Sequence, residues 1–154
     1  MFCSLKKQFE ISWQELIIEN ECLCLGGITH MILRTLGIIY QHWWINRDTF
    51  KKLFPENIAV EYMEDFQILP KSKIIHLSLP YEYGSVMHFG MQTGSTNRGC
   101  TLMSKDHLYE NTVGQQEVLT FNDIKTLNFY YCSNICKYTL ICKNNGYQDP
   151  NDCG

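Results

Sequence analysis

GGITHMILRTLGIIYQH, residues 26–42, is the stretch that decides how this chain folds. Its apolar residues recur at helical spacing, which predicts a helix from about Leu25 to Ile39. The apolar stripe of this helix consists of Ile28, Ile32, Leu36 and Ile39, at intervals of four, four and three. Gly37 lies where the helix is expected to end or turn, because glycine readily adopts the left-handed conformation that closes helices.

Two further segments follow this stretch along the chain. YEYGSVMHFG occupies residues 81–90, and LTFNDIKTLNFY occupies residues 119–130. In this order, the three segments resemble the astacin family of secreted zinc endopeptidases: its active-site helix, its Met-turn and its final helix. The resemblance implies an α+β fold of the metzincin type that lacks much of the family's N-terminal sheet.

The resemblance also maps the family's zinc ligands onto this chain. In the family, two histidines four residues apart on the helix bind zinc with a third beyond a turn glycine, and a glutamate beside the first histidine is the general base. Here His30 matches the first ligand and Gly37 the turn glycine. Met31 occupies the general-base position and cannot take a proton. Arg34 and Tyr40 occupy the other two ligand positions, where a permanent cation and a phenol of high pKa are unsuitable for zinc.

Two further positions also lack the residue that has a role in the family. Phe89 stands where the Met-turn has a tyrosine that ligates zinc or steadies the transition state, and it lacks the hydroxyl. Gln41 stands where the family has a glutamate that pairs with the new N-terminus formed by propeptide removal. A buried glutamate without that ammonium partner would be costly, so a neutral amide is tolerable there.

These replacements predict that zinc does not bind. At about 4 Å and an effective dielectric constant near 20, two unit charges repel by about 4 kcal/mol, and zinc carries two charges. We therefore expect His30 to be a vestigial ligand, now a hydrogen-bonded polar residue. The expected function is that of a catalytically inactive homologue that binds a peptide or protein through the remnant cleft near the Met-turn.

Two alternatives remain open. The first is a secreted zinc metalloendopeptidase with a rearranged metal site. The candidate ligands would be the other histidines, His42, His76, His88 and His107, although histidines scattered over a surface are commoner than a metal site. The second is a truncated product without function, because an exposed strand edge at Glu10–Ile18 would promote aggregation.

The eight cysteines are typical of a disulfide-stapled secreted protein, the alternative being reduced, buried cysteine. The resemblance to astacins implies a Cys3–Cys22 disulfide. It also implies that Cys132 lacks its family partner, so that it is unpaired or joined to Cys136 only under strain. Cys24 and Cys100 are unassigned. Residues 1–131 are expected to form a partial astacin-like domain, and residues 132–154 the incomplete start of an EGF-like module.

Local patterns predict the remaining elements. Ile11–Ile18 is expected to be a strand, while Arg47–Phe54 and Asn57–Leu69 are expected to be helices halted by prolines. Lys71–Gln116 is expected to consist of loops and short strands. The last helix, Thr120–Tyr131, has Thr120 as N-cap, Asp123 in its first turn and an expected core face formed by Phe121, Ile124, Leu127 and Tyr131.

Composition narrows the class of protein further. Of 154 residues, 45% are hydrophobic and 19% charged, which excludes a disordered tail. The net charge of −3 and the absence of a basic cluster make nucleic acid an unexpected partner. No stretch is long enough to span a membrane. No signal peptide is recognisable, although the family is secreted, so we expect the true N-terminus to lie upstream.

Overall fold

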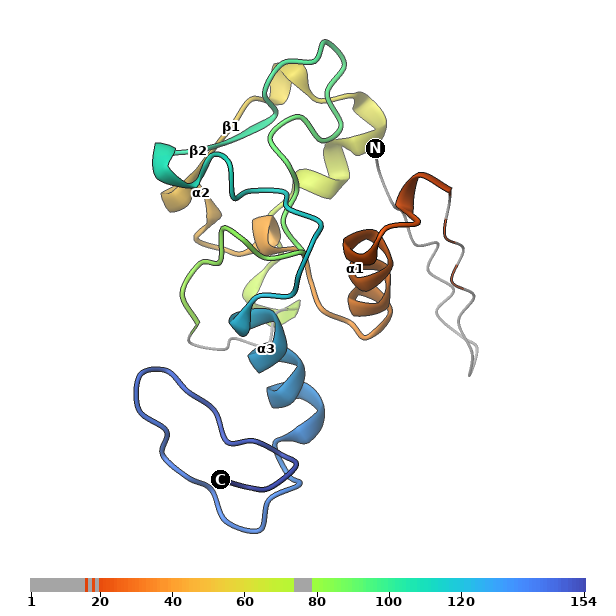
Figure 1. The fold of residues 1–154 in the computed structure, drawn as a ribbon. Helices are drawn as coiled ribbons and strands as arrows, with labels where there is room; N and C mark the ends of the chain where they lie inside the picture. Colours follow the sequence, from red (N-terminus) through yellow and green to blue (C-terminus); the bar gives the residue numbers. More distant parts are fainter. Residues whose placement is uncertain (1–15, 17, 19, 74–78) are drawn as a thin grey trace.

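The computed structural model describes residues 16, 18, 20–73 and 79–154. Its helices and strands are α1 (Leu25–Thr35), α2 (Arg47–Phe50), β1 (Lys51–Leu53), β2 (Leu102–Ser104) and α3 (Phe121–Cys132). Among the described residues, six 3₁₀ helices lie before and between these elements: Asn20–Cys22, Gln41–Trp43, Pro55–Asn57, Val60–Phe66, Lys71–Lys73 and His107–Tyr109. Figure 1 shows α3 lying between the part of the molecule that carries the small sheet and the C-terminal segment. Mixed helix and sheet confirm the α+β prediction.

Helix α1 is closed at both ends by local hydrogen bonds. The Cys24 sulfur accepts from the Gly27 N–H at 3.3 Å and caps the N-terminus. At the C-terminus, the Gly37 N–H donates to the Arg34 carbonyl and the Ile38 N–H to the Leu33 carbonyl, while Gly37 has φ +84°. These bonds form a Schellman motif, which requires the left-handed residue that glycine supplies. The helix therefore ends before Gly37, not at Ile39 as predicted.

The apolar stripe of α1 does not form its buried face. Ile32 and Leu36 are 45% and 37% exposed, whereas His30, Met31 and Leu33 are buried. The core contacts the side of the helix that carries His30, so the apolar stripe of the sequence falls largely on the outer side. Apolar periodicity locates a helix but not the side on which its neighbours lie.

The segment Arg47–Phe54 is only half helical. Helix α2 ends at Phe50, and β1 follows at once, pairing with β2 in antiparallel register so that Lys51 faces Ser104 and Leu53 faces Leu102. The predicted continuous helix was therefore wrong. Beyond β1, the Phe54 N–H donates to the Thr101 carbonyl at 2.9 Å and extends the pairing by one bond.

The segment Asn57–Leu69 winds as a 3₁₀ helix over Val60–Phe66 and is not an α-helix. The apolar residues of this segment still share one side, because Ile58 and Phe66 are buried and Tyr62 packs against the same core. The core itself joins α1 to the loops that follow it, and its buried members are Leu33, Ile38, Tyr40, Ile58, Phe66, Val86, Met87, Phe89 and Leu102.

Helix α3 begins as the sequence predicts. The Thr120 hydroxyl accepts from the Asp123 N–H, and the Asp123 carboxylate accepts from the Thr120 N–H at 3.0 Å, which completes a capping box. Its core face was predicted correctly only for Leu127, which packs against the core together with Tyr130. Phe121, Ile124 and Tyr131 are exposed, whereas Asp123 is buried. The buried carboxylate, absent from any hydrophobic pattern, determines which side faces inward.

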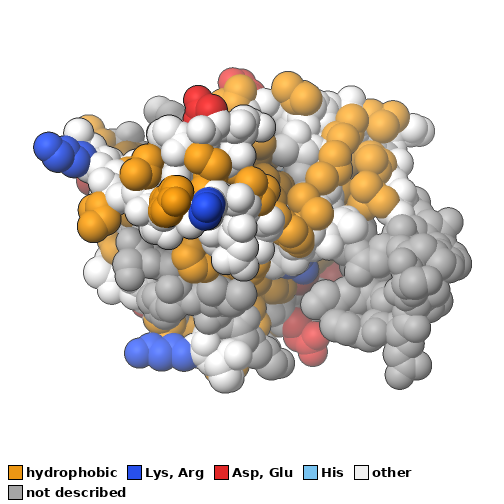
Figure 2. Space-filling view, turned by 90° about the horizontal axis from the view of Figure 1, so that it is seen from below, with side chains coloured by type: hydrophobic (Ala, Val, Ile, Leu, Met, Phe, Trp, Pro, Cys, Tyr) orange, Lys and Arg blue, Asp and Glu red, His pale blue; other side chains and the backbone are white. Residues whose placement is uncertain are grey.

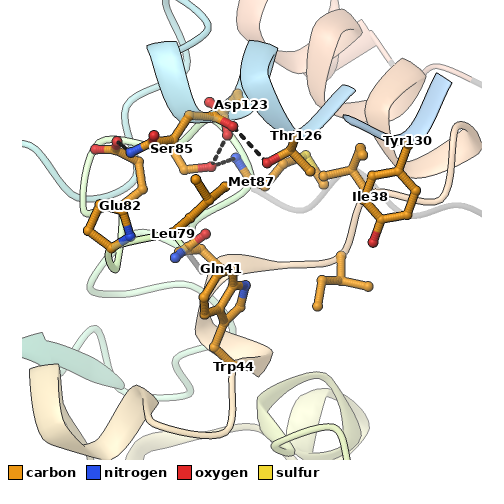
Figure 3. A pocket seen from close by; sticks show the side chains of 13 residues that line it. Ile38, Gln41, Trp44, Leu79, Glu82, Ser85, Met87, Asp123, Thr126 and Tyr130 are labelled. Carbon is orange, nitrogen blue, oxygen red and sulfur yellow. Dashed lines mark hydrogen bonds between the residues drawn. The ribbon is translucent and has the colours of Figure 1, made fainter. Parts of the chain in front are cut away.

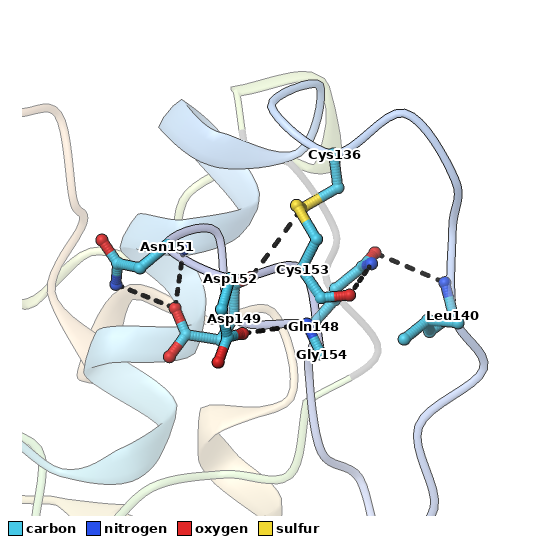
Figure 4. The surroundings of a disulfide bond; sticks show 8 residues. All are labelled: Cys136, Leu140, Gln148, Asp149, Asn151, Asp152, Cys153 and Gly154. Atoms are coloured by element: carbon cyan, nitrogen blue, oxygen red, sulfur yellow. Dashed lines mark hydrogen bonds between the residues drawn. A yellow bond between two sulfur atoms is a disulfide. The ribbon is translucent and has the colours of Figure 1, made fainter.

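The C-terminal segment after α3 is fastened by a disulfide between Cys136 and Cys153, whose Cα atoms are 5.6 Å apart. The Gln148 side chain bridges the same loop, accepting from the Leu140 N–H and donating to the Cys153 carbonyl (Figure 4). Figure 2 views the molecule from below the orientation of Figure 1 and shows many apolar side chains at the surface. Ile141 of the C-terminal segment is 99% exposed.

The remaining cysteines bear on the predicted pairings. Cys132 is free, which is one of the two outcomes that the sequence allowed, and Cys24, Cys100 and Cys142 are also free. Cys22 is buried and disulfide-bonded. Its predicted partner, Cys3, lies outside the described residues, so the Cys3–Cys22 bridge stays a prediction.

Two expectations concern segments that the structure covers incompletely. The predicted strand Ile11–Ile18 falls largely outside the described residues. Within the described part of the chain, none of the helices has the length and hydrophobicity needed to cross a membrane.

Candidate functional site

His30 lies on the buried side of α1 and faces the loop of residues 81–90, called here the Met87 loop. Its Nδ1–H donates to the Val86 carbonyl at 2.9 Å, since a carbonyl oxygen can only accept. Burial lowers the pKa of His30, and the nearby Arg34 charge adds to that effect. The ring is therefore neutral near pH 7, and Nε2 carries its lone pair.

Tyr40 is the centre of the cluster that surrounds His30. The Tyr40 ring stacks on the His30 ring with centroids 5.3 Å apart and contacts the Phe89 ring at 4.8 Å. The Arg34 Cζ atom lies 4.3 Å from the centre of the Tyr40 ring. The residues that the sequence assigned to one site thus meet around a single buried ring.

Two aromatic ring faces hold the Arg34 guanidinium. Its Cζ atom also lies 4.9 Å from the centre of the Trp43 ring, and Trp43 in turn packs edge-on against Tyr40 at 4.7 Å. Cation–π contacts of this kind stabilise by about 0.5–2 kcal/mol each. Among the described residues, the Arg34 Nε atom is buried without a hydrogen-bond partner.

The donor set does not fit a zinc ion. Tyr40 is protonated near neutral pH, because burial raises the pKa of its phenol and outweighs the opposing effect of Arg34. Met31 is buried directly after His30 and offers only a thioether. One neutral imidazole beside a guanidinium therefore replaces the three ligands that a catalytic zinc requires.

The Met87 loop is fixed to α3 by the Asp123 carboxylate. It accepts from the Ser85 hydroxyl at 2.6 Å and from the Val86 N–H at 3.2 Å, in addition to its capping bond with Thr120. On the other side, the Gln41 N–H donates to the Met87 carbonyl at 3.0 Å. The loop that receives the His30 hydrogen bond is thus held from two directions.

Two histidines that the sequence placed on the surface are buried. His42 packs on Phe89 with ring centroids 3.9 Å apart, and its Nε2–H donates to the Asp65 carbonyl at 3.0 Å. His88 accepts from the Tyr81 hydroxyl at 2.7 Å and donates from Nδ1 to the Phe89 carbonyl at 2.8 Å. The surface expectation was therefore wrong for both. His107 is exposed, and His76 lies outside the described residues.

Burial also governs the charge of these two rings. Desolvation lowers the pKa of His88 to about 3, with a further effect of the Lys51 charge, and it lowers the pKa of His42 well below its usual value. Neutral rings explain how they tolerate a core position. Within the described ranges, no three His, Cys, Asp or Glu side chains gather as a potential metal-binding group.

A small cavity opens beside the Met87 loop (Figure 3). It encloses about 30 Å³, room for about one or two water molecules, between the Ile38–Trp44 segment and α3. Gln41, Met87, Glu82 and Asp123 are among its lining residues. Gln41 is buried as expected for a neutral amide, and among the described residues its Nε2 atom has no hydrogen-bond partner.

Sequence reasoning missed Trp43 and Asp65 as parts of the site. The Trp43 Nε1–H donates to the Asp65 carbonyl, and the Trp43 ring supports Arg34. The aromatic pair Trp43-Trp44 so close to Tyr40 was the available signal. Nothing in the pattern pointed to Asp65, since its contribution is a backbone carbonyl.

Comparison with known proteins identifies the family. The model of the Astacin peptidase family matches residues 6–132. The chain belongs to the astacin family. It is 34% identical over 140 residues to zinc metalloproteinase nas-34 of Caenorhabditis elegans, covering 91% of this chain and 23% of that protein. It is 37% identical over 142 residues to zinc metalloproteinase nas-36 of Haemonchus contortus, covering 91% and 23%.

A solved astacin-family structure supports the same fold. High choriolytic enzyme 1, a hatching-enzyme zinc protease from Oryzias latipes, superimposes with a TM-score of 0.63 at 25% identity, covering 69% of this chain and 52% of that one. The astacin-like chain thus spans about a quarter of the length of the nematode relatives and about half of the fish enzyme.

Proposed function

We propose that this astacin-like chain is catalytically inactive and acts by binding. The observation that carries the proposal is the cluster around Tyr40, whose ring contacts Arg34, Phe89 and the one zinc-ligand histidine that remains, His30. These are the positions that the resemblance assigns to zinc ligands and to the Met-turn tyrosine. A cation and two aromatic rings occupy the place of a metal site.

The chemistry of peptide hydrolysis also lacks its proton acceptor. A zinc peptidase activates water by lowering its pKa on the metal and passing its proton to a neighbouring glutamate. Met31 at that position takes no proton. Among the described residues, the hydrogen bond of His30 is to the Val86 carbonyl and not to a carboxylate. Neither half of the water-activating pair is supplied by these residues.

Binding is the function that the remaining surface supports. The cavity beside Met87 combines apolar walls with the polar side chains of Gln41 and Glu82, and at about 30 Å³ it would take only the tip of one side chain of a peptide or protein segment. In this proposal residues 132–154 begin an EGF-like module, fastened by the Cys136–Cys153 disulfide, and the protein is secreted like its family.

A digestion experiment tests inactivity. The purified chain, supplied with zinc, is incubated with denatured casein and with a proteome-derived peptide library, and new termini are counted by mass spectrometry. We expect no cleavage above a boiled control. New termini that form with zinc and disappear on adding a chelator would overturn the proposal and support the rearranged zinc site instead.

A further inference from the structure

Among the residues that the structure describes, Arg34 has no counter-ion at ion-pair distance. The ion pair found among the described residues joins Arg47 to Asp48 at 2.9 Å, and it does not involve Arg34. The Arg34 side chain is partly exposed, stacks on Tyr40 and Trp43, and has a buried Nε atom with no hydrogen-bond partner among the described residues. A charged donor left unfilled in a folded protein is uncommon, because desolvating it without a partner costs free energy.

The guanidinium of Arg47, in the same region, has hydrogen-bond acceptors for its donors. Arg47 is buried, and it donates to the carboxylate of Asp48 and to the carbonyls of His42 and Phe66. Its donors therefore serve the structure. The polar contact of Arg34 is with the neutral Tyr40 phenol, whose pKa it lowers, and within the described ranges no carboxylate lies at ion-pair distance from it.

The surroundings of Arg34 favour an anion with a planar fork. Two aromatic faces hold the guanidinium, and because its Nε atom is buried while the residue as a whole is partly exposed, its Nη groups are the donors offered to a ligand. The titratable groups that act on it are few: His30 is neutral, the Tyr40 phenol is protonated, and the Asp65 carboxyl lies outside ion-pair distance. Guanidinium groups bind carboxylates through two parallel hydrogen bonds.

We propose that Arg34 is the receptor for a carboxylate of a bound peptide, at the place where the family carries a zinc ligand. The carboxylate would accept from the guanidinium while the partly exposed Trp43 ring contacts the peptide backbone or side chains. This inference rests on the proposed binding function and names the chemistry of its ligand. The carboxylate comes either from a peptide C-terminus or from an Asp or Glu side chain.

Three blocked peptides of equal length separate these sources. Ac-Gly-Ala-Gly-NH2 has no carboxylate, Ac-Gly-Ala-Gly-OH has one at its terminus, and Ac-Gly-Glu-Gly-NH2 has one on a side chain. Binding is followed by the Nε–H NMR signal of Arg34 in the intact chain at low salt. We expect one or both carboxylate peptides to shift that signal saturably and the neutral peptide to leave it unchanged.

Variants assign the effect to this guanidinium. Arg34→Met should weaken carboxylate binding about tenfold or more, because hydrogen bonds to charged groups are among the stronger ones. Arg34→Lys keeps the charge but loses the fork, so it should bind with intermediate affinity and serves if the methionine variant fails to fold. Arg98→Met removes an equal charge from an exposed position and should bind like the original chain.

The outcomes are distinct from those of the digestion experiment. Equal shifts with all three peptides, no shift with any, or unchanged affinity in both Arg34 variants would overturn the carboxylate receptor while leaving inactivity untouched. Zinc-dependent cleavage would instead overturn the proposed function itself, whatever the peptides do.

Discussion

At the scale of single residues, the site is a set of substitutions that fit one another. Arg34 is tolerated inside the molecule because Tyr40 and Trp43 present their ring faces to it, and Tyr40 is tolerated because it is protonated. A tyrosine hydroxyl in place of Phe89 would add a polar group to a packed aromatic cluster. Arg34, Tyr40 and Phe89 therefore fit together in one packed cluster.

The buried His88 predicts a pH dependence of stability. Its pKa is about 3 in the folded chain and about 6.5 when unfolded, so below pH 6.5 the unfolded state binds the proton first. Stability should therefore fall as pH drops from 6.5 toward 3, by up to about 1.4 kcal/mol per pH unit from this group. Urea unfolding at pH 7, 6, 5 and 4 measures it.

A histidine variant isolates this contribution. His88→Asn should be less stable at pH 7, because it leaves the Tyr81 hydroxyl without its acceptor, but its stability should decline less between pH 6.5 and 4. His107→Asn removes an exposed histidine and is the matched control. Equal slopes for His88→Asn and the original chain would contradict the assignment.

At the scale of elements, Asp123 connects α3 to the Met87 loop. Asp123→Ala should cost about 3 kcal/mol or more, because it leaves the donors of Ser85, Val86 and Thr120 unpaired in a buried place. Thermal and urea unfolding measure the loss. Asp106→Ala removes a simpler cap, one bond to the Leu108 N–H, and should cost only about 1 kcal/mol. Equal costs would argue against Asp123 as a junction.

The end of α1 depends on the conformation of Gly37. Gly37→Ala should destabilise by about 1 kcal/mol, since φ is +84° there and no neighbouring atom lies within 4 Å to add a clash. Gly37→Asn should cost less, because asparagine tolerates the left-handed region. If alanine were harmless in urea unfolding, the Schellman motif would not be the element that ends α1.

Element prediction succeeded where a local signal was complete. The capping box of α3 and the glycine that ends α1 are written in neighbouring residues, so both were predictable. Which side of each helix faces the core was not, because it depends on the Met87 loop and on the buried carboxylate of Asp123. The strand β1 was missed because its partner, β2, lies about fifty residues further along.

At the scale of the whole molecule, the family could be recognised from three segments, and the site from the spacing of four residues within one of them. The family match, the nematode relatives and the fish enzyme confirm the family and the fold. The partners of the site residues, Trp43 and Asp65 above all, required three-dimensional contacts. Catalytic loss is a proposal about chemistry, and it needs a direct measurement.

Zinc titration of the folded chain is that measurement. Calorimetry and metal analysis after dialysis should find no stoichiometric zinc in the original chain, because one neutral histidine beside a guanidinium is an insufficient ligand set. A variant carrying Met31→Glu, Arg34→His and Tyr40→His should retain about one zinc per chain, provided that it unfolds cooperatively. One tightly held zinc in the original chain, released by a chelator, would contradict the account.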